Sequence, residues 1–520
     1  MKDGQGQRGW TARRSRNGQG WGGQGWGGQG TVLLLLTLVA LIARARTFGN
    51  PVIGFDEQFY LLVGDRMLHG ALPYVDIFDR KPIGLFLLYA GARSLGGDGF
   101  LAYKLVATGF VIATAWGVHR VARRFAGPIG AVVAAILYIL WLNLMEGEGG
   151  QSPVFYNALM LVVAGAVLRA VQGRGRLCVQ GAVAMAAIGI ALQIKYSVLP
   201  EGVAFGCILL WHGWRTRVPM MRLAGMALGW IALALLPTLV AYGVYAAMGH
   251  GPAWLFGNLL SVGGQAARPR ADEMEGLAAC VGILSPLALV IAFGRPWRRV
   301  PGEARDGFGV LLIWLAVTVA AVLLYGRFGS PHYAMPIVLP AVIIAAPVFD
   351  RWRRTWIIAF VLAIALAGQI VLFLSERTKG GAAEAMAVAR AATPASGCLY
   401  VYDGYPALYM LTHSCLPSRW VFPGHLNTRD EASAAAIGTD PVVEIRRILA
   451  QRPGAIVDDY PRFAFGNAAT RAVLRGVLAR DYHLAACVPT GPNRMRLVYR
   501  PGPGTTPAHC PSRANLDSPT

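Results

Sequence analysis

Charged side chains are scarce in this chain of 520 residues: they make up 14% of it, whereas hydrophobic side chains make up 55% and the mean hydropathy is +0.46. Because a soluble domain carries about 25% charged residues, this composition excludes that class and indicates an integral membrane protein. Apolar stretches of about 20 residues, the length that crosses a bilayer, recur from residue 31 to residue 375 and then stop.

Two kinds of motif are missing, and each absence excludes a class of chemistry. There is no Cys-x-x-Cys motif and no Cys/His spacing that suggests a zinc site. There is also no glycine-rich loop of the type that cradles nucleotide phosphates. Lysine is scarce as well, and arginine supplies most of the positive charge.

The positive charge lies in short loops between the apolar stretches. A net charge of +21 on one soluble face would suggest nucleic-acid binding. The alternation here instead follows the positive-inside rule, in which basic loops stay cytoplasmic, so we expect no nucleic-acid partner. The arginines of the predicted cytoplasmic loops are Arg120, Arg123, Arg124, Arg174, Arg176, Arg215, Arg217, Arg222, Arg295, Arg298, Arg299, Arg351, Arg353 and Arg354.

Loops and apolar stretches together predict about eleven membrane helices, with the segments 54–97 and 376–520 on the extracytoplasmic side of a bacterial inner membrane. The predicted spans are 31–47, 100–121, 129–146, 153–170, 178–194, 198–213, 223–248, 277–294, 308–326, 333–348 and 356–375.

Within the first 30 residues, the stretch GQGWGGQGWGGQG repeats WGGQG and cannot build a core, so we expect a disordered cytoplasmic lead over 1–30, rich in glycine, glutamine and tryptophan. The basic start and Ala43-Arg44-Ala45 also resemble a cleavable signal peptide, although the arginines there argue against cleavage. Whether or not this segment is cleaved, Asp56 is expected on the extracytoplasmic side of the membrane.

The pattern changes after residue 375 to short strands that alternate with helices, which predicts a small α/β domain over 376–505 and a disordered tail over 506–520. The expected strands are 398–402, 455–459, 482–488 and 495–500, and the expected helices are 405–411 and 470–479. Asp458 and Asp459 could suggest a metal site, but we interpret them as solvated acids that face a loop.

The seven cysteines fall into two groups. Three lie in predicted spans, and four lie in the outward tail, where disulfides can persist. Four cysteines allow three pairings, of which we expect Cys398–Cys415 and Cys487–Cys510 because each closes a local loop.

The first outward segment, 54–97, is too polar to cross a membrane and too apolar to float free. Phe59, Leu62, Val63 and Met67 share one helical face, which predicts a helix lying in the membrane interface. Gly70 and Pro73 end this helix, and a second one begins after Pro82 in FDRKPIG.

Asp56 follows the first span, where a carboxylate is costly unless it has a function or a partner. Lys81 and Lys195 both lie at the outer interface and could stabilise a lipid phosphate while a carboxylate acts as general base. Two structural alternatives remain open. Residues 79–81 could merely anchor the loop, and Asp56 with Glu57 could cap a helix.

The order DEQFY, GALPY and DRKP after a first span resembles the polyprenyl-phosphate-sugar-dependent glycosyltransferases of family 39. This family includes protein O-mannosyltransferases and lipid A aminoarabinose transferases. The resemblance continues in KYSVLPEG and SPHYAMPIVLP and covers most of the chain from about residue 30 to about residue 500. It implies the C-type glycosyltransferase fold, a multi-span helical domain, here followed by a small α/β domain.

The resemblance also implies roles for single residues. Asp56 matches the catalytic acid, and Lys81 matches the lysine at the donor phosphate. From their charge, we expect Lys195 and Arg80 to be further phosphate contacts. Many relatives carry a second acid before the fourth span, within Asn-Thr-Glu, but this chain has Gln151-Ser152-Pro153 there. The candidates for that second acid, or for acceptor contacts, are Glu57 and Glu148; those for donor contacts are Tyr60, Asp79, His332 and Tyr333.

The resemblance therefore implies an inverting mannosyltransferase-like or pentosyltransferase-like enzyme. Its donor would be a polyprenyl-phosphate sugar, its acceptor an envelope glycolipid such as lipopolysaccharide, a polysaccharide or a protein, and no metal would be required. Two alternatives remain: a lipid or glycan flippase or transporter, and a non-catalytic assembly protein on the same scaffold. A transporter would favour internal repeats and charge at the bilayer midplane, and neither is evident here.

Overall fold

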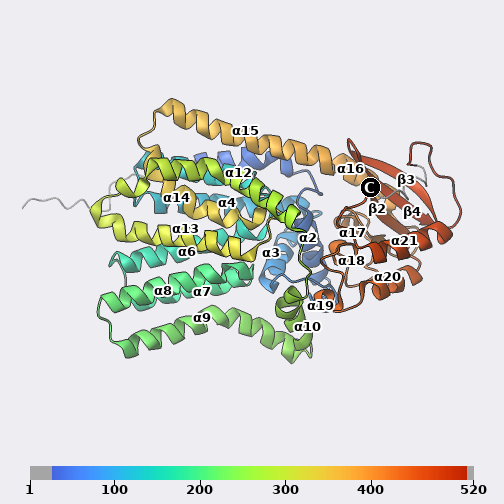
Figure 1. Ribbon diagram of the computed structural model, residues 1–520, viewed down its shortest axis with the longest axis horizontal. Helices are drawn as coiled ribbons and strands as arrows, with labels where there is room; N and C mark the ends of the chain where they lie inside the picture. The colour runs from blue at the N-terminus through green and yellow to red at the C-terminus, as the bar shows by residue number, and fades with distance from the viewer. Residues whose placement is uncertain (1–25, 512–520) are drawn as a thin grey trace, which may run out of the picture.

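The computed structural model describes residues 26–511 and shows a bundle of long helices joined to a small α/β domain (Figure 1). Most of the predicted N-terminal lead, residues 1–25, and the last residues, 512–520, lie outside the described part. The first helix begins at Trp26, so residues 26–30 belong to it and not to the lead.

Eleven helices correspond to the predicted spans. They are α1 (Trp26–Arg44), α4 (Phe100–Ala122), α5 (Pro128–Leu142), α6 (Ser152–Val171), α7 (Leu177–Leu192), α8 (Leu199–Arg215), α9 (Met220–Ala247), α12 (Arg270–Gly294), α13 (Arg305–Tyr325), α14 (Val338–Phe349) and α15 (Arg354–Lys379). Among residues 26–511, seven helical segments are long and apolar enough to cross a membrane. The number of crossings stays a prediction, because α5, α7, α8 and α14 are shorter.

Two of the short helices, α5 and α14, fill the centre of the bundle. Every residue of α14 is buried, and eleven of the 15 residues of α5 are buried. In contrast, α9 and α15 bury three residues each and expose large apolar side chains such as Leu228 and Leu366. This distribution fits a bundle whose outer helices face lipid and whose centre is packed protein.

The basic loops lie at one end of the bundle and the α/β domain at the other. Figure 1 shows the α8–α9 turn and the α14–α15 turn on the left, and the domain on the right. The loops that carry the predicted cytoplasmic arginines are therefore opposite the α/β domain.

Segment 54–97 forms two helices as predicted, α2 (Phe55–Met67) and α3 (Ile83–Arg93). The prediction that α2 exposes one face to the membrane interface is wrong, because Glu57 through Asp65 are all buried. Gly64 touches the backbone of Ala90 in α3, and the ring of Phe59 lies 5.0 Å from that of Phe422 in the α/β domain. The α/β domain thus covers the side of α2 that was expected to lie open.

The α/β domain contains a four-stranded sheet in the order β1-β2-β4-β3, with β1 and β2 parallel and the other pairs antiparallel. The strands are β1 (Leu399–Val401), β2 (Ala455–Tyr460), β3 (Tyr482–Gly491) and β4 (Arg494–Pro501), and all four were predicted. The helices are α16 (Ala382–Ala392), α17 (Leu408–Leu411), α18 (Gly424–Asn427), α19 (Ala434–Ile437), α20 (Pro441–Ala450) and α21 (Ala468–Asp481). Alternate strand residues pack toward α16 on one face and toward α20 and α21 on the other.

The interpretation of Asp458 and Asp459 as solvated loop acids is wrong. Both lie within β2 and are buried. Asp458 pairs with Arg471, and Asp459 pairs with Arg494 and Arg496. Arginines distant in sequence supply the counter-charges that let carboxylates enter the domain core.

Both expected disulfides are confirmed, Cys398–Cys415 and Cys487–Cys510. The second disulfide links Cys510 to Cys487 in β3. It thereby fixes residues 506–511, the start of the segment that was expected to be a disordered tail.

Replacing Cys398 and Cys415 by serine tests the stabilising role of the first disulfide. Opening its loop of 17 residues should lower the free energy of unfolding by ~3 kcal/mol, because the unfolded chain regains freedom. Intrinsic fluorescence during heating should show a lower unfolding midpoint. The exposed free thiol of Cys178 gives the matched control, Cys178→Ser; an equal midpoint in both variants would contradict the prediction.

Candidate active site

Five segments meet where the helical bundle joins the α/β domain: the start of α2, the loop 79–82, the loop before α6, the chain after α7, and the turn Pro331–Tyr333. Close backbone packing brings two of them together. A Cβ on Gly84 would overlap the backbone of Gln193, whose carbonyl accepts a hydrogen bond from Leu85 N at 3.1 Å. Lys81 and Lys195 consequently lie at neighbouring ends of α3 and α7.

Asp56 lies in the first turn of α2 and is half-buried. Its Oδ2 accepts hydrogen bonds from Tyr60 Oη at 3.3 Å and from Gln151 Nε2 at 3.5 Å. Burial alone would raise the pKa of the Asp56 carboxyl, but nearby positive charge, chiefly Lys81, outweighs it and holds that pKa below its ordinary value. Asp56 is therefore ionised at neutral pH, as a general base must be.

Lys81 faces the same space. Its ammonium lies 5.5 Å from the centre of the Tyr60 ring, and its backbone carbonyl accepts a hydrogen bond from Tyr74 Oη at 2.7 Å. Burial opposes the charge of Lys81, but Asp79 and Asp56 overcompensate and raise its pKa. Lys81 therefore keeps its charge at every pH of interest.

Lys195 adds a second cation on the opposite side. Its Nζ lies 4.6 Å from the centre of the Tyr333 ring. Burial, and then repulsion from Lys81, lower the pKa of Lys195 to about 7, because Asp56 compensates only in part. The ammonium groups of Lys81 and Lys195 thus lie on either side of Asp56, with Asp79 as a second carboxylate beside Lys81, and two neighbouring cations suit an anionic ligand.

His332 and Tyr333 line this site from the turn before α14. The His332 ring is buried beside the Tyr333 ring, at 4.4 Å between centres, and its Nδ1 lies 2.8 Å from Oε2 of Glu146. Asp79 is also close, and burial raises the pKa of its carboxyl although Lys81 acts in the opposite direction. The predicted donor contacts Tyr60, Asp79, His332 and Tyr333 thus all surround the two lysines.

Glu57 and Glu148 lie behind Asp56 in a separate buried cluster. Tyr103 Oη donates to Glu57 Oε2 at 3.2 Å, and burial together with Glu148 raises the pKa of Glu57 to about 8. The guanidinium of Arg44 donates to the carbonyls of Gly147 and Gly149, at 2.7 and 2.5 Å, and so holds the loop that carries Glu148. Gln151, at the position of the missing family acid, is the residue of this loop that reaches Asp56.

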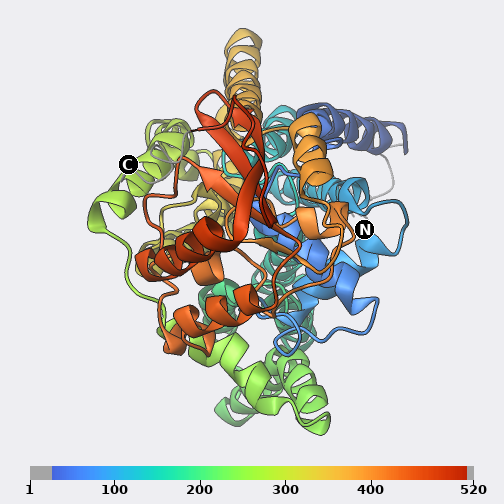
Figure 2. The same cartoon turned by 90° about the vertical axis from the view of Figure 1, so that its right-hand side faces the viewer.

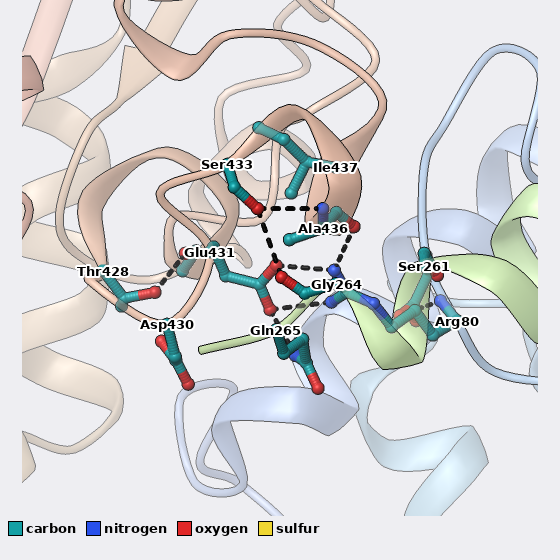
Figure 3. Close-up of polar contacts among 12 residues, drawn as sticks. Arg80, Ser261, Gly264, Gln265, Thr428, Asp430, Glu431, Ser433, Ala436 and Ile437 are labelled. Carbon is teal, nitrogen blue, oxygen red and sulfur yellow. Dashed lines mark hydrogen bonds and ion pairs between the residues drawn. The ribbon is translucent and has the colours of Figure 1, made fainter. Parts of the chain in front are cut away.

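Arg80 points into the α/β domain, toward Glu431 and Ala436 (Figure 3). It donates to both carboxylate oxygens of Glu431, at 2.7 and 2.5 Å, and to the carbonyl of Ala436. Gln265 Nε2 donates to the same carboxylate at 2.5 Å, and the neighbouring Asp430 pairs with Arg268 at 3.1 Å. Arg80 is engaged in a domain contact and is not free for a phosphate in this structure.

Sequence reasoning missed Glu431, Asp430, Gln265 and Lys104. Glu431 lies 351 residues from Arg80, and no local motif marks it. Lys104 is buried in α4, where its Nζ donates to the carbonyls of Thr47 and Asn50 and fixes the chain that leads to α2. The scarcity of lysine was the one signal that could have found it. Within residues 26–511, no group of three or more His, Cys, Asp or Glu side chains is arranged to hold a metal ion.

No family model and no curated protein matches the chain. Among solved structures, ArnT from Cupriavidus metallidurans in the apo state has the same fold, with a TM-score of 0.63 and 15% identity over 91% of this chain and 98% of ArnT. The apo oligosaccharyltransferase from Archaeoglobus fulgidus gives a TM-score of 0.49 at 13% identity, over 84% of this chain and 70% of its own. The arabinofuranosyltransferase AftD from Mycobacteria gives 0.47 at 14%, over 91% and 40%. The likeness to ArnT confirms the predicted C-type glycosyltransferase fold.

A double-mutant cycle on Arg80 and Glu431 measures the domain contact. Each single change to alanine strands a charge in a poorly solvated interface and should lower stability by ~3 kcal/mol, whereas the double change should cost clearly less than the sum. Denaturant unfolding gives the coupling energy. The exposed pair Arg480–Asp481 is the control and should show no measurable coupling. Additive losses at Arg80 and Glu431 would contradict the contact.

Proposed function

We propose that this protein is an integral membrane glycosyltransferase that moves a monosaccharide from a polyprenyl-phosphate donor to an envelope acceptor. The observation that carries the proposal is the convergence of the ionised Asp56 with Lys81 and Lys195 in one half-buried site. The fold shared with ArnT supports it.

In the proposed reaction, Asp56 takes the proton from an acceptor hydroxyl or amine. The acceptor atom attacks the anomeric carbon, and the bond from that carbon to the phosphate oxygen breaks with inversion. The electron pair leaves with the polyprenyl phosphate, and Lys81 and Lys195 stabilise the developing negative charge. Tyr60 and Tyr333 place their rings against the two ammonium groups and so limit their movement.

The position of the basic loops supports an outward-facing site. Those loops lie at the end of the bundle opposite the α/β domain, and the site lies beside that domain. If the basic end is cytoplasmic, the site and the disulfide-bonded domain are extracytoplasmic. The donor sugar must then be presented on the outer leaflet of a bacterial inner membrane, and the acceptor is a glycolipid, a polysaccharide or a protein.

Asp56→Asn tests the proposed catalytic role. The amide cannot take the proton, so transfer should fall by ~10²–10⁴-fold while folding is kept. Mass spectrometry of envelope lipids and glycans, in cells that carry either form, would show the lost sugar. Asp98→Asn alters an exposed acid of the same outer segment and is the control. Full transfer by a normally folded Asp56→Asn protein would refute the proposal and favour a transporter or an assembly protein.

Lys195 gives a prediction for pH. Because the pKa of Lys195 is lowered to about 7, its charge is present below this pH and is lost as pH rises through it. The kcat/KM for the donor should therefore fall above pH 7. In Lys195→Arg the fall should move to much higher pH, because guanidinium stays charged. Lys81→Arg is the comparison and should leave the position of this fall unchanged; a fall that stays in place in Lys195→Arg would contradict the assignment.

A further inference from the structure

A cavity of about 1020 Å³ lies in the α/β domain, separate from the candidate active site. It is bounded by α21, the end of α20, strands β3 and β4, and the chain after residue 501. In Figure 1 the label of α21 lies toward the right-hand end of the molecule, and in Figure 2, which views that end, α21 is in front. The cavity is therefore distant from the predicted membrane surface.

Six arginines line the cavity: Arg446, Arg452, Arg462, Arg471, Arg475 and Arg480. The acids beside them are already paired, Asp458 with Arg471, Asp459 with Arg494 and Arg496, and Asp481 with Arg480. Arg446 and Arg452 are exposed, and within residues 26–511 neither forms an ion pair. Arg446 and Arg452 thus add positive charge to the lining without an ion-pair partner among the described carboxylates.

Membrane orientation does not explain why Arg446 and Arg452 are positively charged. The positive-inside rule concerns short loops within about 15–20 residues of a membrane helix. Arg446 and Arg452 follow the end of α15, Lys379, by far more than that, and they lie within a folded domain. Core packing does not explain them either, because both side chains are exposed.

We propose that this cavity, the basic groove, binds an anionic saccharide chain that carries carboxylate or phosphate groups. Guanidinium groups form bidentate hydrogen bonds with both kinds of anion. Tyr460 also lines the groove and is half-buried, and an aromatic side chain of this kind combines an apolar ring with a polar end. The volume is at the upper end of the range of about 300–1000 Å³ for small-ligand pockets, so the groove suits several sugar units rather than one.

The segment after residue 501 forms one wall of the groove and includes Gly502, Gly504 and Thr506. The Cys487–Cys510 disulfide fixes the far end of this wall to β3. The wall is therefore present before a ligand arrives, which reduces the entropy cost of binding. The proposal does not depend on transfer at Asp56. If transfer does occur there, a glycan bound in the groove would be held on the same protein.

Equilibrium binding by the full-length protein in nanodiscs of zwitterionic lipid tests the proposal. The probes are fluorescent polygalacturonate, which carries carboxylates, fluorescent phosphomannan, which carries phosphates, and neutral dextran of similar length. We expect one or both anionic chains to bind, more weakly at high salt, and dextran not to bind. The preferred probe identifies the acidic group. Failure of both anionic chains to bind would overturn the proposal.

The double variant Arg446→Ala, Arg452→Ala should weaken this binding by about tenfold or more, because two charge-assisted contacts are lost. The matched control is Arg377→Ala with Arg390→Ala, which removes the same charge from exposed positions of α15 and α16 outside the groove and should bind as the unaltered protein does. Equal loss in both variants would show attraction by net charge alone and would overturn the proposal. Binding only to vesicles that contain phosphatidylglycerol would overturn it too. None of these binding measurements requires glycosyl transfer. They therefore test the groove even if the proposed catalytic role of Asp56 is wrong.

Discussion

The ion pair between Arg80 and Glu431 joins the two parts of the protein at the point where the candidate active site lies. Arg80 directly precedes Lys81, so the contact that docks the α/β domain also fixes the backbone of the proposed phosphate-binding lysine. Gln265 and the carbonyl of Ala436 complete the same contact, in which both charged side chains are shielded from solvent (Figure 3). The position of the loop 79–82 therefore depends on the docking of the α/β domain.

This arrangement explains why charged residues collect in so apolar a chain. A carboxylate or ammonium at the membrane edge is costly unless a partner of opposite charge or a ligand is present. Asp56 and Lys81 stabilise each other's charged forms, whereas Lys195 is left with a lowered pKa. An anionic donor phosphate beside Lys195 would favour the charged form of this lysine.

Much of the fold followed from the sequence because its signals are local. Apolar length and arginine position marked the long helices, alternation marked β1–β4, and sequence proximity marked both disulfides. The errors concern residues whose surroundings come from distant segments. The apolar face of α2 correctly indicated a helix, but Phe422 of the α/β domain packs against Phe59 of that face, and Glu57 through Asp65 are all buried. Asp458 and Asp459 looked solvated because their partners, Arg471, Arg494 and Arg496, come later in the chain.

The sequence by itself determined the helical bundle with its α/β domain, the order of the basic loops, and the choice of Asp56 and Lys81 as reactive candidates. Hydrophobic length, charge alternation and residue chemistry are properties of short segments, so they can be inferred without the fold. Only the tertiary structure decided that Gln151 rather than Glu148 reaches Asp56, and that Arg80 binds Glu431 and not the proposed phosphate site. Both contacts join side chains that are far apart in the sequence, by 95 and 351 residues. Only the packing of the folded chain brings such side chains together.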